Sequence, residues 1–287
     1  MITVTDVRSI SGDSSFLIDN GNTSILYDTG FAFTGNAVAA NVKSILGERK
    51  LDFIFLTHSH YDHVLGSVYV KKLYPKAQIV ASSYCKKIFE KPTARAVMRE
   101  LDKKFALSLG ISEHEDLIDS LSVDIIVEDG EIFRAGEMKF QAVSLPGHTK
   151  CSFGYYLESE KLLLSCETLG VFDGEQNIIP SYLIGYRTTL ESIEKAKALD
   201  IEKILIPHLG LFEGSTCRYY LENAKKSAVE TCREIATILK FGGTRDDAFE
   251  HFKKKFYFGS VVDAYPIDAF TLNTNIMIDL ITKEILT

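Results

Sequence analysis

Short apolar runs with the spacing of β-strands fill the first third of the chain. Three of them are rich in β-branched and aromatic residues, and the turn sequences SGD and NGN separate them as in antiparallel hairpins. Farther along, strand-like runs alternate with stretches of helical spacing. The predicted strands are 2–10, 14–20, 23–30, 51–57 and 77–82, and the predicted helices between them are 36–47 and 64–75. Hairpins followed by alternating strands and helices indicate an α/β protein whose layered sheets are flanked by helices.

This pattern is interrupted once and ends before the last quarter of the chain. Residues 91–122 are polar and helix-prone, and we predict a helical insertion there. Predicted strands return at 123–133, 138–147, 152–159, 161–166 and 203–208, with a helix at 189–200. From Gly214 onward the pattern is helical and amphipathic. We therefore expect a domain over 1–213 and a helical extension over 214–287 that packs on the same domain.

Composition and charge narrow the class of protein. The 287 residues, 46% hydrophobic and 25% charged, are typical of a soluble globular protein with a sizeable core. The net charge of −7 argues against a nucleic acid as partner, because proteins that bind nucleic acids usually carry a basic face. No apolar run is long enough to span a membrane, and the N-terminus lacks the apolar region of a signal peptide. The five scattered cysteines include no CxxC pair, which favours free thiols and a cytoplasmic protein.

The most distinctive sequence is THSHYDH, which follows the predicted strand at 51–57. It places four potential metal ligands on a strand-to-helix turn: His58, His60, Asp62 and His63. Three more potential ligands follow other predicted strands in the same way: His148, Glu167 and His208. A single histidine after a strand is more often a hydrogen-bonded loop residue than a ligand. Five of the seven histidines share this placement, however, and the joint pattern predicts a site for a divalent cation with nitrogen and oxygen ligands.

Other residues with reactive or polar side chains receive more ordinary interpretations. His114 and His251 fall in polar helical stretches, and we expect both to be solvated at the surface. Asp28, in the turn YDTG, is a candidate to accept a hydrogen bond from a ligand imidazole; an aspartate that starts a tight turn is the alternative. Cys151 and Cys166 lie near candidate ligands and are interpreted as buried structural thiols, not nucleophiles.

Together these residues resemble the metallo-β-lactamase superfamily. Its signature is HxHxDH, then a histidine in a PGHT-like turn, an acid after a short strand and a last histidine, and the order and spacing match over about residues 1–213. The resemblance implies an αββα sandwich with a two-metal site at one edge, between the sheets. It assigns His58, His60 and His148 to one metal, Asp62, His63 and His208 to the second, and Glu167 to the bridging position.

Glu167 departs from the family pattern, which usually has aspartate. Its carboxylate stands on a stem one methylene longer, so it bridges two metals only if its loop sits back; a mononuclear site with Glu167 at the surface is the alternative. The metals are expected to be zinc, with iron or manganese as alternatives. Such ions hold a hydroxide that attacks the substrate at neutral pH. Asp62 and Glu167 are then the catalytic acids, and Asp62 also passes a proton to the leaving group.

The substrate is expected to be a small molecule. The helical extension is similar to those of the glyoxalase II and thioesterase branch, which implies a thioester, ester or lactone. The extension is expected to cover the site, and a homodimer interface is its alternative role. Four residues are expected to line the substrate pocket, with ordinary loop packing as the alternative: Tyr61, Tyr182, Tyr186 and Arg187.

Three other functions stay open. A phosphodiesterase shares HxHxDH but usually adds a clamp domain or a basic exosite. An iron-dependent oxidoreductase shares the ligand pattern, although the complete second set of ligands argues against a single iron. A metal-binding, ligand-sensing regulator with weak residual hydrolysis belongs to a different class, and the glutamate at position 167 keeps it open. A turnover screen on metal-loaded protein separates the regulator from an enzyme.

Overall fold

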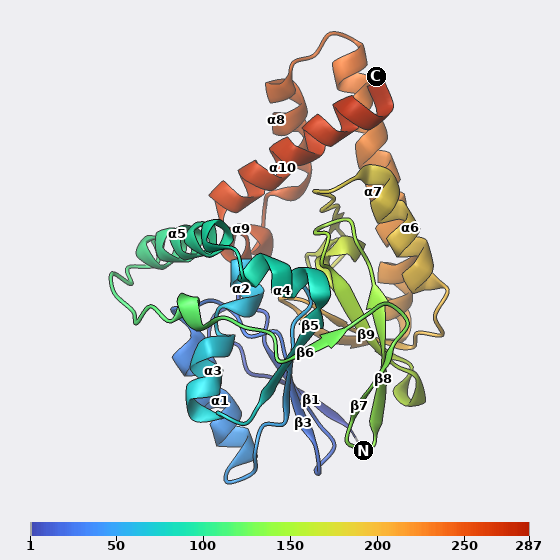
Figure 1. The fold of residues 1–287 in the computed structure, drawn as a ribbon. Helices are drawn as coiled ribbons and strands as arrows, with labels where there is room; N and C mark the ends of the chain where they lie inside the picture. The colour runs from blue at the N-terminus through green and yellow to red at the C-terminus, as the bar shows by residue number, and fades with distance from the viewer. Residues whose placement is uncertain (1, 287) are drawn as a thin grey trace. The chain divides into compact units, whose positions relative to one another are not determined.

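The computed structural model describes residues 2–286 (Figure 1). The chain forms two compact units. Unit 1 contains the residues up to Ser144 and the segment Phe153–Ser159, and unit 2 contains Leu145–Ser152 and the chain from Glu160 onward. The expected boundary at residue 213 stays a prediction.

The first sheet of unit 1 begins as a meander and continues as a parallel sheet. Its strands, in the order in which they pair, are β1 (Thr3–Asp6), β2 (Phe16–Asp19), β3 (Ser24–Tyr27), β4 (Phe53–Phe55), β5 (Gln78–Ser82) and β6 (Ile125–Val127). β1, β2 and β3 pair antiparallel, as the hairpin signals predict, and β3 to β6 pair parallel. Parallel neighbours need crossover segments, and the helices between the strands provide them.

Helices of unit 1 occupy the crossovers, as predicted for 36–47, 64–75 and the insertion but not for Ser83–Phe89. They are α1 (Gly35–Leu46), α2 (Tyr61–Val64), α3 (Ser67–Leu73), α4 (Ser83–Phe89), α5 (Pro92–Ser108) and the 3₁₀ turn η1 (Ile118–Ser120). α1 and α3 lie side by side along the sheet (Figure 1). The insertion is helical in α5, but the helix-prone stretch before η1 is irregular. Asp116 explains the difference, because its carboxylate accepts from the Ile118 amide and pairs with Arg99 instead of continuing a helix.

Three strands of the second sheet, β7 (Ile132–Ala135), β8 (Met138–Ser144) and β9 (Phe153–Leu157), also belong to unit 1. Aromatic side chains join the two sheets face to face. The ring of Phe55 in β4 lies 5.5 Å from Phe133, 5.2 Å from Phe140 and 4.5 Å from Tyr155, measured between centroids. The Tyr155 hydroxyl donates to the Leu56 carbonyl at 2.9 Å. This buried contact confirms the predicted sheet-on-sheet core.

The strands of unit 2 are β10 (Leu162–Leu164), β13 (Lys203–Ile206), β14 (Gly210–Glu213) and a small ribbon of β11 (Val171–Phe172) and β12 (Ile178–Ile179). The first three pair in the order β14-β13-β10, with β10 and β13 parallel and β13 and β14 antiparallel. Two 3₁₀ turns adjoin β10: η2 (Glu158–Glu160) and η3 (Glu167–Leu169). The ribbon and β14 were not predicted, because two- to four-residue strands leave little periodicity.

The helices of unit 2 form most of the last quarter of the chain. They are α6 (Tyr186–Lys197), α7 (Gly214–Lys240), α8 (Arg245–Phe256), α9 (Ser260–Ala264), α10 (Ile267–Ile281) and the π-helical turn η4 (Thr282–Leu286). α6 runs beside α7 (Figure 1). The aromatic rings of Phe252, Phe256 and Phe270 pack together between α8 and α10. The predicted helical extension is confirmed, and none of the helices in residues 2–286 is long and apolar enough to cross a membrane.

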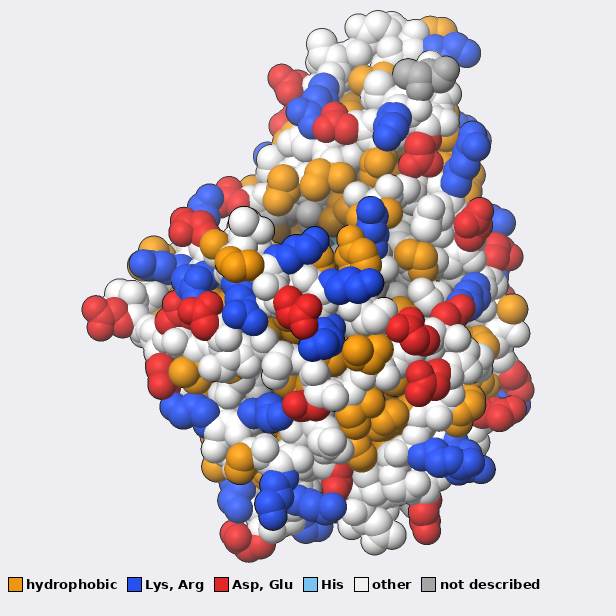
Figure 2. Space-filling view, in the orientation of Figure 1, with side chains coloured by type: hydrophobic (Ala, Val, Ile, Leu, Met, Phe, Trp, Pro, Cys, Tyr) orange, Lys and Arg blue, Asp and Glu red, His pale blue; other side chains and the backbone are white. Residues whose placement is uncertain are grey.

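Surface charge is mixed on the face drawn in Figure 2. Lysine and arginine side chains alternate there with aspartate and glutamate, with apolar side chains between them. The exclusion of a nucleic-acid partner stays a prediction.

Candidate metal centre

The THSHYDH motif starts where β4 ends and continues into the single turn of α2. Its backbone therefore turns sharply, and the turn brings three imidazoles together. The ring centroid of His58 lies 4.1 Å from that of His63 and 4.7 Å from that of His60. His58 and His63 are buried, and Asp62 keeps 22% of its side chain exposed, with Oδ2 3.6 Å from His63 Nε2.

Asp28 holds the imidazole of His63 from behind. Its Oδ2 lies 2.7 Å from His63 Nδ1, and both side chains are fully buried. The same carboxylate accepts from the Thr57 amide at 2.9 Å and from the Ser14 hydroxyl at 3.2 Å. Asp28 also has a positive φ of 50° directly after β3. The predicted contact of Asp28 with the imidazole of a candidate ligand is confirmed, whereas no tight turn begins at this residue.

Backbone contacts place the segment that follows Asp28 against the motif. The Thr29 amide donates to the His63 carbonyl at 2.8 Å, and the Gly66 amide donates to the Gly30 carbonyl at 3.1 Å. A Cβ atom at Gly66 would lie 1.9 Å from the Thr29 carbonyl oxygen. Glycine at position 66 is therefore required for the approach of the two segments.

The other three candidate ligands all lie in unit 2. His148 stands in the turn after β8, Glu167 starts η3 after β10, and His208 follows β13. Glu167 Oε2 lies 2.7 Å from His148 Nε2, and its other oxygen, Oε1, lies 3.3 Å from His208 Nε2. His208 has a φ of 64°, which is uncommon for a residue with a side chain. Backbone strain of this kind is concentrated at functional sites.

The imidazoles of three candidate ligands have an oxygen at Nδ1, so that Nε2 is the nitrogen turned away from the protein scaffold. Besides His63 with Asp28, His58 Nδ1 lies 3.0 Å from Thr57 Oγ1, and His148 Nδ1 lies 2.8 Å from Ser181 Oγ and 3.0 Å from the Ser181 carbonyl oxygen. Such outer partners fix the ring orientation of histidines that bind metals.

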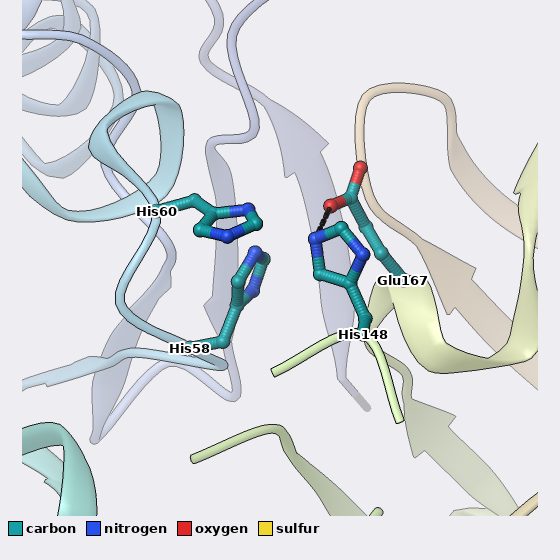
Figure 3. A group of neighbouring side chains, drawn as sticks. All are labelled: His58, His60, His148 and Glu167. Carbon is teal, nitrogen blue, oxygen red and sulfur yellow. Dashed lines mark ion pairs between the residues drawn. The ribbon is translucent and has the colours of Figure 1, made fainter. Parts of the chain in front are cut away.

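The potential ligands fall into two candidate groups, and each group draws on both units. The first has His58 and His60 from unit 1 with His148 and Glu167 from unit 2, and the second has Asp62 and His63 from unit 1 with His208 from unit 2. Figure 3 shows the first group, with the two imidazoles of the motif next to each other and Glu167 against His148. Imidazole nitrogens and carboxylate oxygens of this number suit zinc and similar divalent ions. The donor atoms that each unit supplies thus fit the metals that the sequence predicts.

The expected substrate residues have very different surroundings. Tyr61 is partly buried against Phe31, with ring centroids 5.6 Å apart. Tyr182 is fully buried and packs edge-on against Tyr186 at 5.5 Å, whereas Arg187 is exposed. Contact of these four residues with a substrate stays a prediction, and the burial of Tyr182 is what ordinary packing produces.

The expectation for His114 is wrong. Only 21% of its side chain is exposed, and its Nε2 lies 3.0 Å from Oδ2 of the fully buried Asp102. Burial raises the pKa of Asp102 to about 7 and lowers the pKa of His114. His251 is exposed as expected and pairs with Glu234 at 3.0 Å. The five cysteines are free, as predicted, and all five are buried, as predicted for Cys151 and Cys166.

Histidine and carboxylate side chains that follow the ends of β-strands are typical of one class of protein, the metal-binding α/β folds. The chain belongs to the metallo-beta-lactamase superfamily, whose sequence pattern matches residues 11–208 and whose members are mostly hydrolases. The predicted resemblance is confirmed.

Individual relatives are more distant. The chain is similar to a glyoxylase B2 of Dictyostelium discoideum, with 27% identity over 113 residues, which cover 39% of this chain and 34% of that protein. It is similar to a hydroxyacylglutathione hydrolase of Brucella ovis, with 29% identity over 119 residues, 42% of this chain and 34% of that protein. The matched segments span about a third of the length of these curated relatives.

Solved structures show the same fold. A metallo-beta-lactamase family protein from Thermus thermophilus has a TM-score of 0.66 to this chain at 17% identity, and the match covers 99% of this chain and 93% of that one. The fold class, including the C-terminal helices, is confirmed.

Proposed function

We propose that the protein is a hydrolase that uses two divalent metal ions and acts on a small thioester. The observation that carries the proposal is the placement of Glu167, whose two carboxylate oxygens face two different imidazoles. Oε2 lies against His148, a member of the first ligand group, and Oε1 lies against His208, a member of the second. A carboxylate that serves both groups is what a two-metal site requires. The longer stem of glutamate is compatible with this placement.

Bound divalent ions supply an activated water and an electrophile for the substrate carbonyl. The protein's own contribution is orientation. Asp28 and Ser181 hold the imidazoles of His63 and His148 so that both present Nε2. Asp62 is partly exposed, so its carboxylate can exchange protons with solvent, and we assign it the proton delivered to the leaving thiolate.

The thioester class is supported by the relatives that are glyoxylase and hydroxyacylglutathione hydrolase proteins. It also agrees with the apolar and aromatic surroundings of the motif, where Tyr61 packs on Phe31. Zinc is the proposed metal, and iron and manganese are the alternatives that a metal analysis distinguishes.

The test is a turnover panel on zinc-loaded protein, with acyl thioesters, lactones and phosphodiesters. We expect thioesters to be hydrolysed fastest and two zinc ions per chain. Glu167→Gln should lower both zinc content and turnover, the latter by a factor of about 100, because a neutral amide no longer balances two dications. The matched control is Glu234→Gln, which removes an acid that pairs with His251 in unit 2 but lies outside both ligand groups. Full zinc content and turnover in Glu167→Gln would refute the bridging role, and hydrolysis of phosphodiesters alone would refute the substrate class.

A further inference from the structure

The C-terminal turn η4 caps a helix that lies far from it in sequence. α6 begins after Gly185, has no side-chain cap of its own and carries Arg187 but no acid in its first turn. Its first amides therefore lack a local acceptor. Glu284 supplies one, because Oε1 accepts from the Tyr186 amide at 3.1 Å and Oε2 from the Arg187 amide at 3.3 Å. A carboxylate at this end of a helix is also stabilised by the helix dipole.

Gly185 leaves the space that Glu284 occupies. A Cβ atom at this position would lie 3.1 Å from Glu284 Oε1. The φ of Gly185 is −179°, which is extended backbone that any residue adopts. The glycine is therefore explained by the close approach of the carboxylate, and not by its own conformation.

The segment between Gly185 and β12 is fastened to the turn that contains His148. The amides of Leu183 and Ile184 both donate to the Gly147 carbonyl, at 2.8 and 2.9 Å. Ser181, at the start of the segment, contacts His148 Nδ1 through its hydroxyl at 2.8 Å. The imidazole is thus oriented by a segment whose far end is the start of α6.

The helix itself also touches this turn. Ser192 in α6 donates through its hydroxyl to the Pro146 carbonyl at 2.6 Å. A Cβ atom at Gly147 would lie 2.4 Å from the Thr189 hydroxyl oxygen, so the turn and the helix are in direct contact. A shift or fraying of the first turn of α6 would therefore move the backbone next to His148.

We propose that Glu284 is a positioning residue for the candidate metal ligand His148. By capping α6 it fixes the segment 181–185, and this segment fixes the imidazole whose Nε2 faces Glu167. The inference rests on the proposed function, because it requires His148 to bind a metal.

The experiment measures zinc affinity by competition with a chromophoric chelator, without any substrate. Glu284→Ala should weaken zinc binding about three- to tenfold, the lower end of the effect of outer partners of metal ligands, because it acts through an intervening segment. Asp279→Ala is the matched control: it removes an acid of α10 that pairs with Arg245 of α8 at 2.7 Å. It should leave zinc affinity unchanged.

A double variant tests the mechanism. In Glu284→Ala the carboxylate no longer lies next to Gly185, and the nearest remaining neighbour of a Cβ atom there is Thr188 Oγ1 at 3.3 Å. Gly185→Ser can therefore place a local N-cap hydroxyl on α6. The double variant should recover most of the lost zinc affinity, which a general loss of stability in the tail would not allow. If Glu284→Ala does not fold, Glu284→Gln takes its place, because it keeps one acceptor oxygen. It should show a smaller loss of zinc affinity, and adding Gly185→Ser to it should cause no further loss.

The outcomes separate the two proposals. Zinc affinity in Glu284→Ala equal to that of Asp279→Ala, or no recovery in the double variant, would overturn the positioning role and leave the proposed function standing. A wild type that binds zinc but hydrolyses no thioester would overturn the substrate class and leave the positioning role standing. A wild type that binds no zinc would overturn both.

Discussion

Replacing Asp28 with asparagine exchanges one carboxylate oxygen for an amide that donates. The carboxylate accepts from the Thr57 amide through Oδ1 and lies against His63 Nδ1 through Oδ2, at 2.9 and 2.7 Å. If the new NH₂ group faces the Thr57 amide, two donors oppose each other in a buried place. The NH₂ group therefore takes the Oδ2 position, because the Ser14 and Thr57 hydroxyls there can rotate to accept whereas the Thr57 amide cannot. It then faces His63, which has to carry its proton on Nε2. That tautomer cannot offer Nε2 to a metal.

The size of the effect follows from these contacts. A hydrogen bond to a charged group contributes about 1.5–3 kcal/mol. Because 1.4 kcal/mol corresponds to a factor of ten, Asp28→Asn should weaken metal binding by the group that contains His63 by about 10- to 100-fold. The backbone should be little affected, since asparagine accepts the φ of 50° at this position.

Chelator competition with zinc measures this loss, and thermal unfolding in excess chelator measures the stability of the metal-free protein. The control is Asp19→Asn, which changes an acid of β2 that pairs with Arg49 and touches no candidate ligand. We expect the zinc affinity of Asp19→Asn to match that of the wild type. Wild-type zinc affinity in Asp28→Asn would show that the outer carboxylate does not set the tautomer of His63.

Three further results are expected. Asp102 has a pKa of about 7 in the folded protein and 3.8 when unfolded, so the free energy of unfolding should fall as the pH rises from about 4 to 7. Asp102→Asn should abolish up to about 4 kcal/mol of that fall, and urea titrations that give the same pH profile for both proteins would contradict this. Gly66→Ala should destabilise unit 1 by about 3 kcal/mol or more, because the new Cβ clashes with the Thr29 carbonyl. The φ of −62° at this position suits alanine, so the clash alone is tested, and an unaltered midpoint of denaturation would be inconsistent with it. Chelation should lower the melting temperature of wild type, because free zinc at 100 times its Kd stabilises the folded state by about 2.7 kcal/mol, and calorimetry that finds equal melting with and without chelator would count against a bound metal.

The local sequence pattern predicts most of the helices and strands, because apolar residues recur along the chain with the period of the helix or strand whose face they bury. The run before His58 is a buried strand, and the polar cluster after it is a turn, so the motif was placed correctly at a strand end. The irregular stretch before η1 was not predicted, because its helix-forming composition is overridden by the side-chain contacts of Asp116. Propensity is a weak guide where tertiary contacts decide.

Partners of the candidate ligands were harder to predict than the ligands themselves. Asp28 was a candidate because it stands in the recognisable sequence YDTG. Thr57 and Ser181 carry no comparable signal, since a hydroxyl at a strand end or in a loop is common in any protein. Glu284 acts on residues almost a hundred positions away, and only the folded chain brings them together. The pairing of His114 with Asp102 is equally non-local, so the surface location expected for His114 was incorrect.

The cap on α6 also has a consequence for the order in which the protein matures. During synthesis the strands that carry His148 and Glu167 leave the ribosome well before η4 exists, and α6 must then begin with unsatisfied amides. Contacts of such long sequence separation form late. A nascent chain that already has all seven candidate ligands can therefore hold metal only loosely through His148. On the positioning role proposed for Glu284, the affinity for metal increases when this carboxylate reaches the start of α6.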